Sequence, residues 1–156
     1  MSDRIAVINE GRLVQVPDSK SIYYKPQDRF VASFVGESSL LPCRIGQTKN
    51  GTGTVSIVGR VRGMARLNGQ SDGESGWLFA RPEHVDISPR GVMTDVPNTL
   101  DGVVEDALFL GESTRYVVRC EDERITIKQQ NRRQTQFSSG TAVIVSWNAD
   151  NCIVLN

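Results

Sequence analysis

From Leu40 onward, the chain alternates short runs of β-branched and aromatic residues with Gly-containing turns, and almost no helical period is present. The turn signals include Asn50-Gly51, Asn68-Gly69 and Asp72-Gly73. Many short strands at this spacing are typical of a small closed or half-closed barrel. The sequence therefore predicts a mainly β fold of OB-like small barrels, with strands at Leu40–Ile45, Thr54–Val58, Met64–Leu67, Trp77–Ala80, Val85–Ile87, Leu100–Leu110, Thr114–Cys120, Arg124–Lys128, Ala142–Trp147 and Ile153–Leu155.

Residues 1–36 follow a different pattern, which predicts a β-hairpin and two short helices. Two β-type runs, Arg4–Ile8 and Leu13–Val16, flank a turn in which Gly11 suits the left-handed position. Asp18 can cap a helix over residues 19–25, because its carboxylate can accept from the free amides of the first turn. A second helix is expected over residues 27–35, with one face formed by Phe30, Val31 and Phe34.

The change of pattern at Gly36–Ser39 predicts a boundary between residues 1–36 and residues 37–156. A domain of fewer than ~40 residues usually needs a disulfide, a metal or a partner to be stable. We therefore expect residues 1–36 to be the tail of a larger domain, or to dock on a partner.

Charge and composition argue against several classes of function. The chain has 18 basic and 18 acidic side chains and only 6% aromatic residues. A barrel that binds nucleic acid needs exposed aromatic rings among basic residues, so we expect no nucleic-acid partner. No apolar run approaches the ~18 residues of a membrane helix, so we expect a soluble chain without direct membrane insertion. The 3 cysteines lack a C-x-x-C pair, which predicts reduced, buried thiols.

The most specific resemblance to a known family lies at the N-terminus. The stretch Met1–Gln15 resembles the end of the nucleotide-binding domain of ABC transporters. The segments Ile22–Pro26, Arg29–Ala32 and Phe34–Glu37 resemble the helical link that leads out of the ATPase domain in importer ATPases for polyamines, ferric iron and sugars. The resemblance implies that residues 1–36 are the C-terminal remnant of such a domain.

The β-rich remainder resembles the transport-associated OB domain that is appended to those ATPases. The matching pieces are Arg81-Pro82-Glu83, Gly102-Val103-Val104, Phe109-Leu110-Gly111 with Thr114-Arg115-Tyr116, and Gly140 followed by Val143, Val145 and Trp147. The resemblance runs in the right order through nearly the whole chain. It implies that residues 37–156 form an OB-like regulatory domain.

The motifs of ATP hydrolysis are not found in this sequence. The family needs a P-loop, an acidic magnesium ligand, a signature loop and a switch histidine. The sequence contains no G-x-x-x-x-G-K-[ST] motif, and its sole histidine, His84, lies in the OB-like part. We therefore expect the chain to be inactive by itself and to hold no cofactor or metal, with ATP and Mg²⁺ bound by the parent subunit.

The remaining candidate site is a partner or ligand surface formed by Arg81, Glu83, His84, Arg115 and Tyr116. Arg81 and Glu83 could bind a partner or a small anion, or could form an internal ion pair at a strand end. A lone histidine without partner spacing favours a structural or surface role for His84 over metal ligation. Phe109 and Trp147 are expected to pack in the barrel, because aromatic rings bury large areas.

The resemblance implies a regulatory and dimer-forming region of the ATP-hydrolysing subunit of a bacterial importer. Its partners would be a second copy of itself, the ATPase domain and the membrane subunits of a transporter at the cytoplasmic face of the cell membrane. Spermidine or putrescine is the favoured cargo, with ferric iron or a sugar as alternatives. A stand-alone OB-like sensor of a small ligand or anion is the alternative function, and a ligand-induced melting shift would favour it.

Overall fold

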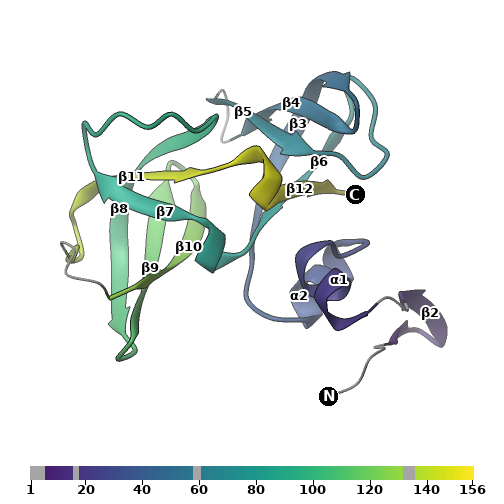
Figure 1. Cartoon of the computed structure of the whole chain (residues 1–156), viewed down its shortest axis with the longest axis horizontal. Coiled ribbons are helices and arrows are strands. Elements are labelled where there is room, and N and C mark those ends of the chain that lie inside the picture. Colours follow the sequence, from purple (N-terminus) through teal and green to yellow (C-terminus); the bar gives the residue numbers. More distant parts are fainter. Residues whose placement is uncertain (1–5, 16–17, 58–60, 132–135) are drawn as a thin grey trace.

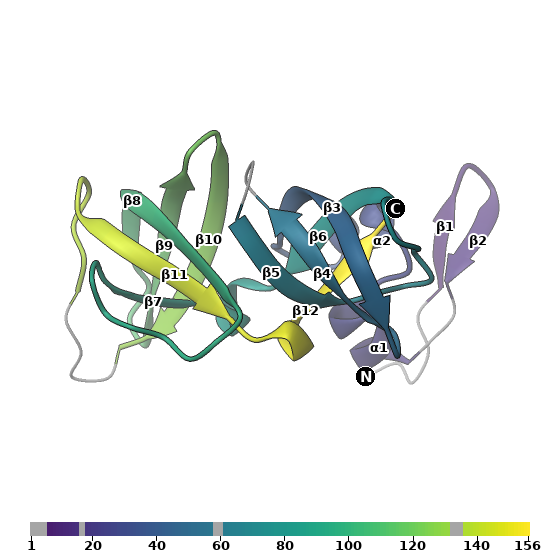
Figure 2. The same ribbon diagram turned by 90° about the horizontal axis from the view of Figure 1, so that it is seen from above.

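The computed structural model describes residues 6–15, 18–57, 61–131 and 136–156 (Figure 1). The predicted strand residues Arg4, Ile5, Val16 and Val58 lie outside the described residues. The described residues form a hairpin, two short helices, a closed five-stranded barrel and a separate five-stranded sheet, which we call the half-barrel. Figure 2 shows the two β-units side by side, with the N-terminal hairpin farthest from the half-barrel. The predicted mainly β fold is confirmed.

The N-terminal hairpin consists of β1 (Val7–Asn9) and β2 (Arg12–Gln15). Its turn residues, Glu10 with φ 50° and Gly11 with φ 77°, both adopt the left-handed conformation. This pair gives the two-residue turn whose twist matches that of the strands. The left-handed position predicted for Gly11 is confirmed.

The helices α1 (Ser19–Tyr24) and α2 (Arg29–Phe34) each begin after an aspartate that caps the first turn. The amide of Ser21 donates to Oδ1 of Asp18, and the amide of Val31 donates to Oδ1 of Asp28, both at 2.9 Å. These bonds satisfy amides that have no partner within the helix. The cap predicted at Asp18 is confirmed, and the cap at Asp28 places the second helix two residues later than predicted.

The apolar face predicted for α2 is only partly the face that the structure buries. Val31 and Ala32 are fully buried, whereas Phe34 is 70% exposed and Phe30 stacks on it with ring centroids 6.2 Å apart. Ala32 packs against a cluster that includes Phe79 of the closed barrel. The helix therefore meets the barrel through Ala32, and the two phenylalanine rings stay exposed.

The closed barrel has the strand order β12-β5-β4-β3-β6. Its last strand pairs in parallel with β5 and antiparallel with β6, so the end of the chain completes the barrel. Closure leaves the sheet without free edges. The strands are β3 (Ser39–Lys49), β4 (Thr52–Ile57), β5 (Val61–Arg66), β6 (Ser75–Ala80) and β12 (Cys152–Leu155).

The half-barrel has the strand order β10-β9-β8-β11-β7, with every pair antiparallel. It is formed by the chain between β6 and β12, after the short 3-10 helix η2 (Pro82–His84), and a second 3-10 helix, η3 (Ala149–Asn151), leads back to the barrel. Its strands are β7 (Asp86–Pro89), β8 (Asn98–Phe109), β9 (Ser113–Cys120), β10 (Glu123–Gln130) and β11 (Ala142–Trp147).

One apolar core runs through both β-units, from Leu41 in β3 to Val118 in β9. Trp147 is fully buried in it, as predicted. Phe109 was expected to pack there too, and that prediction is wrong, because its side chain is 63% exposed at the end of β8. The three cysteines are free and buried, as predicted. Burial raises the pKa of the Cys43 thiol to about 11, so it stays protonated at neutral pH.

Asn98 joins the two β-units at the point where β8 begins. Its side chain is fully buried. The amide of Met64 in β5 donates to Oδ1 of Asn98 at 2.9 Å, and Nδ2 of Asn98 donates to the carbonyl oxygens of Met64 at 2.9 Å and Trp147 at 3.2 Å. A Cβ atom at Gly63 would collide with Oδ1, so glycine allows this close approach.

Replacing Asn98 by alanine tests this junction. We expect Asn98→Ala to lower the free energy of unfolding by about 2–4 kcal/mol, because buried backbone groups of Met64 and Trp147 lose their partner. Urea unfolding followed by tryptophan fluorescence measures the change. Asn148→Ala is the matched control, because Asn148 is exposed and its side chain makes no cap hydrogen bond; its effect should stay within about 0.5 kcal/mol. Equal effects of the two substitutions would contradict the role of Asn98.

Candidate functional site

The predicted site residues fall on three neighbouring elements. Arg81 follows β6, Glu83 and His84 lie in η2, and Arg115 and Tyr116 lie in β9. Arg81, Glu83, His84 and Arg115 surround the C-terminal end of α1 and the linker that follows α2. Tyr116 is fully buried against Phe137 and is therefore part of the core, not of the predicted surface.

Arg81 anchors the N-terminal segment to the closed barrel. Its side chain is 1% exposed. Nε and Nη2 donate to the carbonyl oxygen of Tyr23 at 3.1 and 3.0 Å, and Nη1 donates to the carbonyl oxygen of Glu37 at 3.0 Å. The guanidinium carbon lies 4.1 Å from the ring centroid of Tyr23 and 4.7 Å from that of Phe79. Burial lowers the pKa of Arg81, and the planar guanidinium fits this site because its fork reaches two carbonyl groups at once.

Glu83 extends this anchor from η2. The hydroxyl of Tyr23 donates to Oε1 of Glu83 at 2.5 Å. Burial raises the pKa of Tyr23 to about 12, and the hydrogen bond to Glu83 adds to the shift, so the tyrosine is neutral and donates. An internal ion pair between Arg81 and Glu83 was one of the two predicted arrangements; the structure instead directs Arg81 to carbonyl oxygens and Glu83 to Tyr23.

His84 stacks on Tyr24, with ring centroids 5.5 Å apart and planes 16° from parallel. This places the imidazole in the same contact between η2 and α1 that Glu83 and Tyr23 form. Across the described parts of the chain, no group of three or more His, Cys, Asp or Glu side chains is placed to hold a metal ion. The role of His84 seen in the structure is packing against α1.

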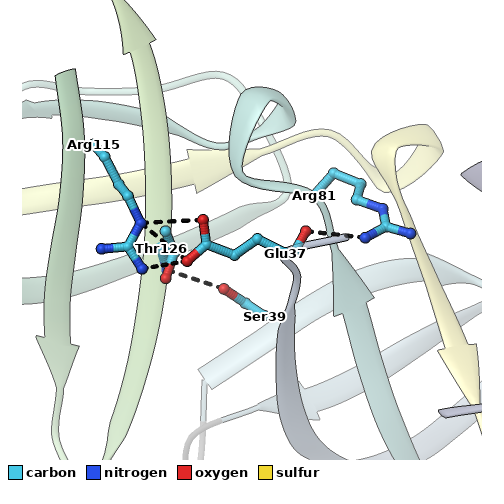
Figure 3. A network of polar contacts seen from close by, with 5 residues as sticks. All are labelled: Glu37, Ser39, Arg81, Arg115 and Thr126. Atoms are coloured by element: carbon cyan, nitrogen blue, oxygen red, sulfur yellow. Dashed lines mark hydrogen bonds and ion pairs between the residues drawn. The ribbon is translucent and has the colours of Figure 1, made fainter. Parts of the chain in front are cut away.

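Glu37 connects the linker to the half-barrel. Nε of Arg115 donates to both carboxylate oxygens of Glu37, at 3.0 and 3.1 Å, and Nη2 donates to Oε1 as well (Figure 3). These bonds hold the pKa of Glu37 below its usual value of 4.5 and raise that of Arg115. Two residues further on, Oγ of Ser39 accepts from the amide of Thr126 in β10 at 3.0 Å. The linker therefore contacts both β-units.

Sequence reasoning found Arg81 and Arg115 but not the residues that join them. Tyr23 and Glu37 lie in segments noted only for their resemblance to the helical link, and Ser39 lies at the predicted boundary, so none of them was a candidate site residue. The signal in the sequence was the change of pattern at Gly36, after which the chain must turn from a helix into a strand. Asn98 had no signal beyond the turn dipeptide Pro97-Asn98.

The geometry describes a structural junction built around a linker, and comparison with known proteins places it in a family. The TOBE domain family matches residues 78–155, which include Arg81, Glu83, His84 and Arg115. The chain belongs to the TOBE-domain family. Within the described residues, no helix is long and apolar enough to cross a membrane.

Relatives extend the similarity to nearly the whole chain. The spermidine/putrescine import ATP-binding protein PotA of Rubrobacter xylanophilus is 33% identical over 160 aligned positions, which cover 99% of this chain and 41% of that protein. The PotA of Nitrosospira multiformis is 32% identical and covers 100% of this chain and 44% of that protein. The chain thus spans about two fifths of the length of these relatives and matches a C-terminal portion of such a subunit.

A solved structure confirms the fold. The cytoplasmic molybdate-binding protein ModG, in a form with molybdate bound, aligns with a TM-score of 0.66 over 74% of this chain and 93% of its own. The sequence identity is 13%, so the likeness concerns the fold alone.

The anchor predicts that Arg81 cannot be replaced by another cation. We expect Arg81→Ala to lower the free energy of unfolding by about 2–4 kcal/mol, because buried hydrogen bonds to two carbonyl groups are lost. Arg81→Lys should keep less than half of the stabilisation, since a single ammonium group lacks the fork. Urea unfolding measures both, with the exposed Arg44→Ala in β3 as control. A lysine variant as stable as the wild type would show that charge alone anchors α1.

The contact of Glu37 predicts a dependence on pH. Its pKa is lowered in the folded chain, so its stabilisation is present above about 4.5 and is lost as the pH falls through the lower folded value. We expect a double-mutant cycle with Glu37→Gln and Arg115→Gln to give a coupling energy of about 0.2–1 kcal/mol at pH 7, which falls as the carboxylate becomes protonated at acidic pH. A coupling energy that grows on acidification would contradict this interpretation.

Proposed function

We propose that this chain is the regulatory and dimer-forming C-terminal region of the ATP-hydrolysing subunit of a bacterial ABC importer of the polyamine type. The proposal rests on the residues outside the TOBE match, because they too are similar to an importer subunit. The match to the family covers residues 78–155, yet the likeness to PotA of Rubrobacter xylanophilus covers 99% of the chain and so includes residues 6–36. In this proposal, residues 1–36 are the end of a nucleotide-binding domain.

The surface of residues 6–36 supports this assignment. Ile8 and Leu13 face each other across the hairpin, and both are exposed. The stacked rings of Phe30 and Phe34 are exposed as well. A two-stranded hairpin is marginally stable in water, and apolar residues gathered in so short a segment are typical of a surface that another domain covers. The ATPase domain of the same subunit is the proposed cover.

The residues of the sequence indicate which functions belong to the ATPase domain and which to this chain. ATP and Mg²⁺ would bind in the ATPase domain, because the P-loop that cradles phosphates is not among these residues. The chain would act by keeping two ATPase subunits together, since a permanent C-terminal contact raises the effective concentration of one for the other. The membrane subunits of the importer would be its further partners, at the cytoplasmic face of the cell membrane.

The proposed cargo rests on the names of the relatives, which are spermidine/putrescine import proteins. Ferric iron and sugars remain the alternatives that the resemblance to importer ATPases allows. A stand-alone sensor of a small ligand or anion is the rival function, and the fold shared with ModG is what favours it. Spermidine and molybdate, added separately in thermal melting of the chain, probe that rival, and a raised melting temperature would support it.

The proposed dimer predicts the mass of the chain in solution. We expect multi-angle light scattering to give twice 17.2 kDa over a wide range of concentration, because the C-terminal contact is the part that holds the subunits together. A mass of 17.2 kDa at all concentrations would sink the dimer-forming role of this region.

A control variant separates this dimer from association through the exposed rings. The double substitution Phe30→Ser with Phe34→Ser removes the apolar side chains of α2 that point away from the barrel. We expect the double variant to remain a dimer, since the proposed contact lies in residues 37–156. A dimer that dissociates in this variant would show that uncovered helix surface, and not the TOBE domain, causes the association.

A further inference from the structure

The half-barrel has an edge strand, β10, that the linker covers. In an open antiparallel sheet, alternate amides of the edge strand point away from its partner. The amide of Thr126 donates to Oγ of Ser39 at 3.0 Å. Ser39 is buried and also begins β3, where it pairs with Ala80 of the closed barrel. A single linker residue therefore serves both the closed barrel and the open edge of the half-barrel.

We call residues 37–39 the strap. Figure 3 shows Glu37 and Ser39 reaching the half-barrel at Arg115 and Thr126, while the carbonyl oxygen of Glu37 turns the other way toward Arg81. The strap thus lies between a buried arginine on one side and the β9–β10 edge on the other.

The two sides of the strap differ in their exposure to water. On the side of the closed barrel, the guanidinium of Arg81 is buried and its hydrogen bonds are shielded. On the side of the half-barrel, the side chain of Glu37 is 46% exposed and that of Arg115 is 30% exposed. Water and salt compete with exposed ion pairs, so their net contribution is small. The ion pair of Glu37 with Arg115 is therefore weaker than the contact of Glu37 with Arg81, and the part-buried bond of Ser39 to Thr126 lies beside it.

We propose that the strap is a releasable latch: its contacts with Arg115 and Thr126 open and close together, while its contact with Arg81 stays formed. The opening is local, because one apolar core continues through both β-units and prevents their separation. In the open state the Thr126 amide and the Arg115 side chain become accessible. A regulatory role of this latch rests on the proposed function. In that function, an ATPase domain attached through α1 and α2 would shift the equilibrium between the open and closed states of the latch.

Hydrogen exchange of the Thr126 amide, measured by NMR on the 156-residue chain, tests the latch. We expect Ser39→Ala to speed this exchange by about three- to tenfold, the effect of losing one hydrogen bond. Glu37→Gln should also speed it, although Glu37 itself contacts Arg115 and not Thr126, because the two contacts open together. Amides in the core, such as that of Val143, should keep their rates.

Glu105→Gln is the matched control. It removes another exposed contact of a glutamate with an arginine of the half-barrel, in which Nε of Arg124 donates to Oε2 of Glu105 at 2.7 Å. Glu105 does not contact the strap, so its substitution should leave exchange at Thr126 unchanged. Equal acceleration by Glu37→Gln and Glu105→Gln would overturn the latch, as would faster exchange at Val143, which would indicate global destabilisation.

The outcomes separate the latch from the proposed function. If exchange at Thr126 responds as expected in a chain that light scattering shows to be monomeric, the latch stands and the dimer-forming role fails. If the chain is dimeric but Glu37→Gln leaves exchange at Thr126 as in the wild type, the latch is overturned and the proposed function is unaffected.

Discussion

The arrangement of this chain depends on the hydrogen bonds of one buried guanidinium group, that of Arg81. A charge removed from water is tolerated only when its donors are paired, and Arg81 meets this condition with carbonyl oxygens from Tyr23 and Glu37. Those two carbonyl groups lie before and after α2. The Arg81 side chain therefore holds the chain on both sides of this helix. The rings of Tyr23 and Phe79 near the guanidinium complete its surroundings.

The second constraint is the path of the chain between the two β-units. The half-barrel is formed by a segment inserted between β6 and β12, and β12 returns to close the barrel. Two crossings and the buried side chain of Asn98 tie the units together. The linker adds an exposed ion pair of Glu37 with Arg115 and a part-buried hydrogen bond of Ser39 with Thr126. Glu37 and Ser39 are not part of the shared core, so the linker contact can open locally while that core remains packed.

The strands, turns and caps were predictable because their signals are local. Alternating apolar residues predict strands, Asn50-Gly51 predicts a turn and Asp18 predicts a helix cap. Each signal concerns residues only a few positions away, and the structure contains these features. The faces of the elements were harder to predict. A helical pattern cannot show which of two adjoining faces meets a barrel, so Phe34 was placed on the same face as the buried Val31. Closure by β12, parallel to β5, depends on pairing across the whole chain and left no local trace.

The candidate site shows the same limit. Arg81 and Arg115 were identified from motifs, but their partner Glu37 emerges only when the linker is placed between two β-units. Glu37 presents its backbone to the buried arginine and its side chain to the exposed one. In the proposed function, a movement of α1 and α2 would therefore carry the closed barrel with it and would strain the contact with the half-barrel first. A weak contact beside a strong one is what permits such a junction to change state without unfolding.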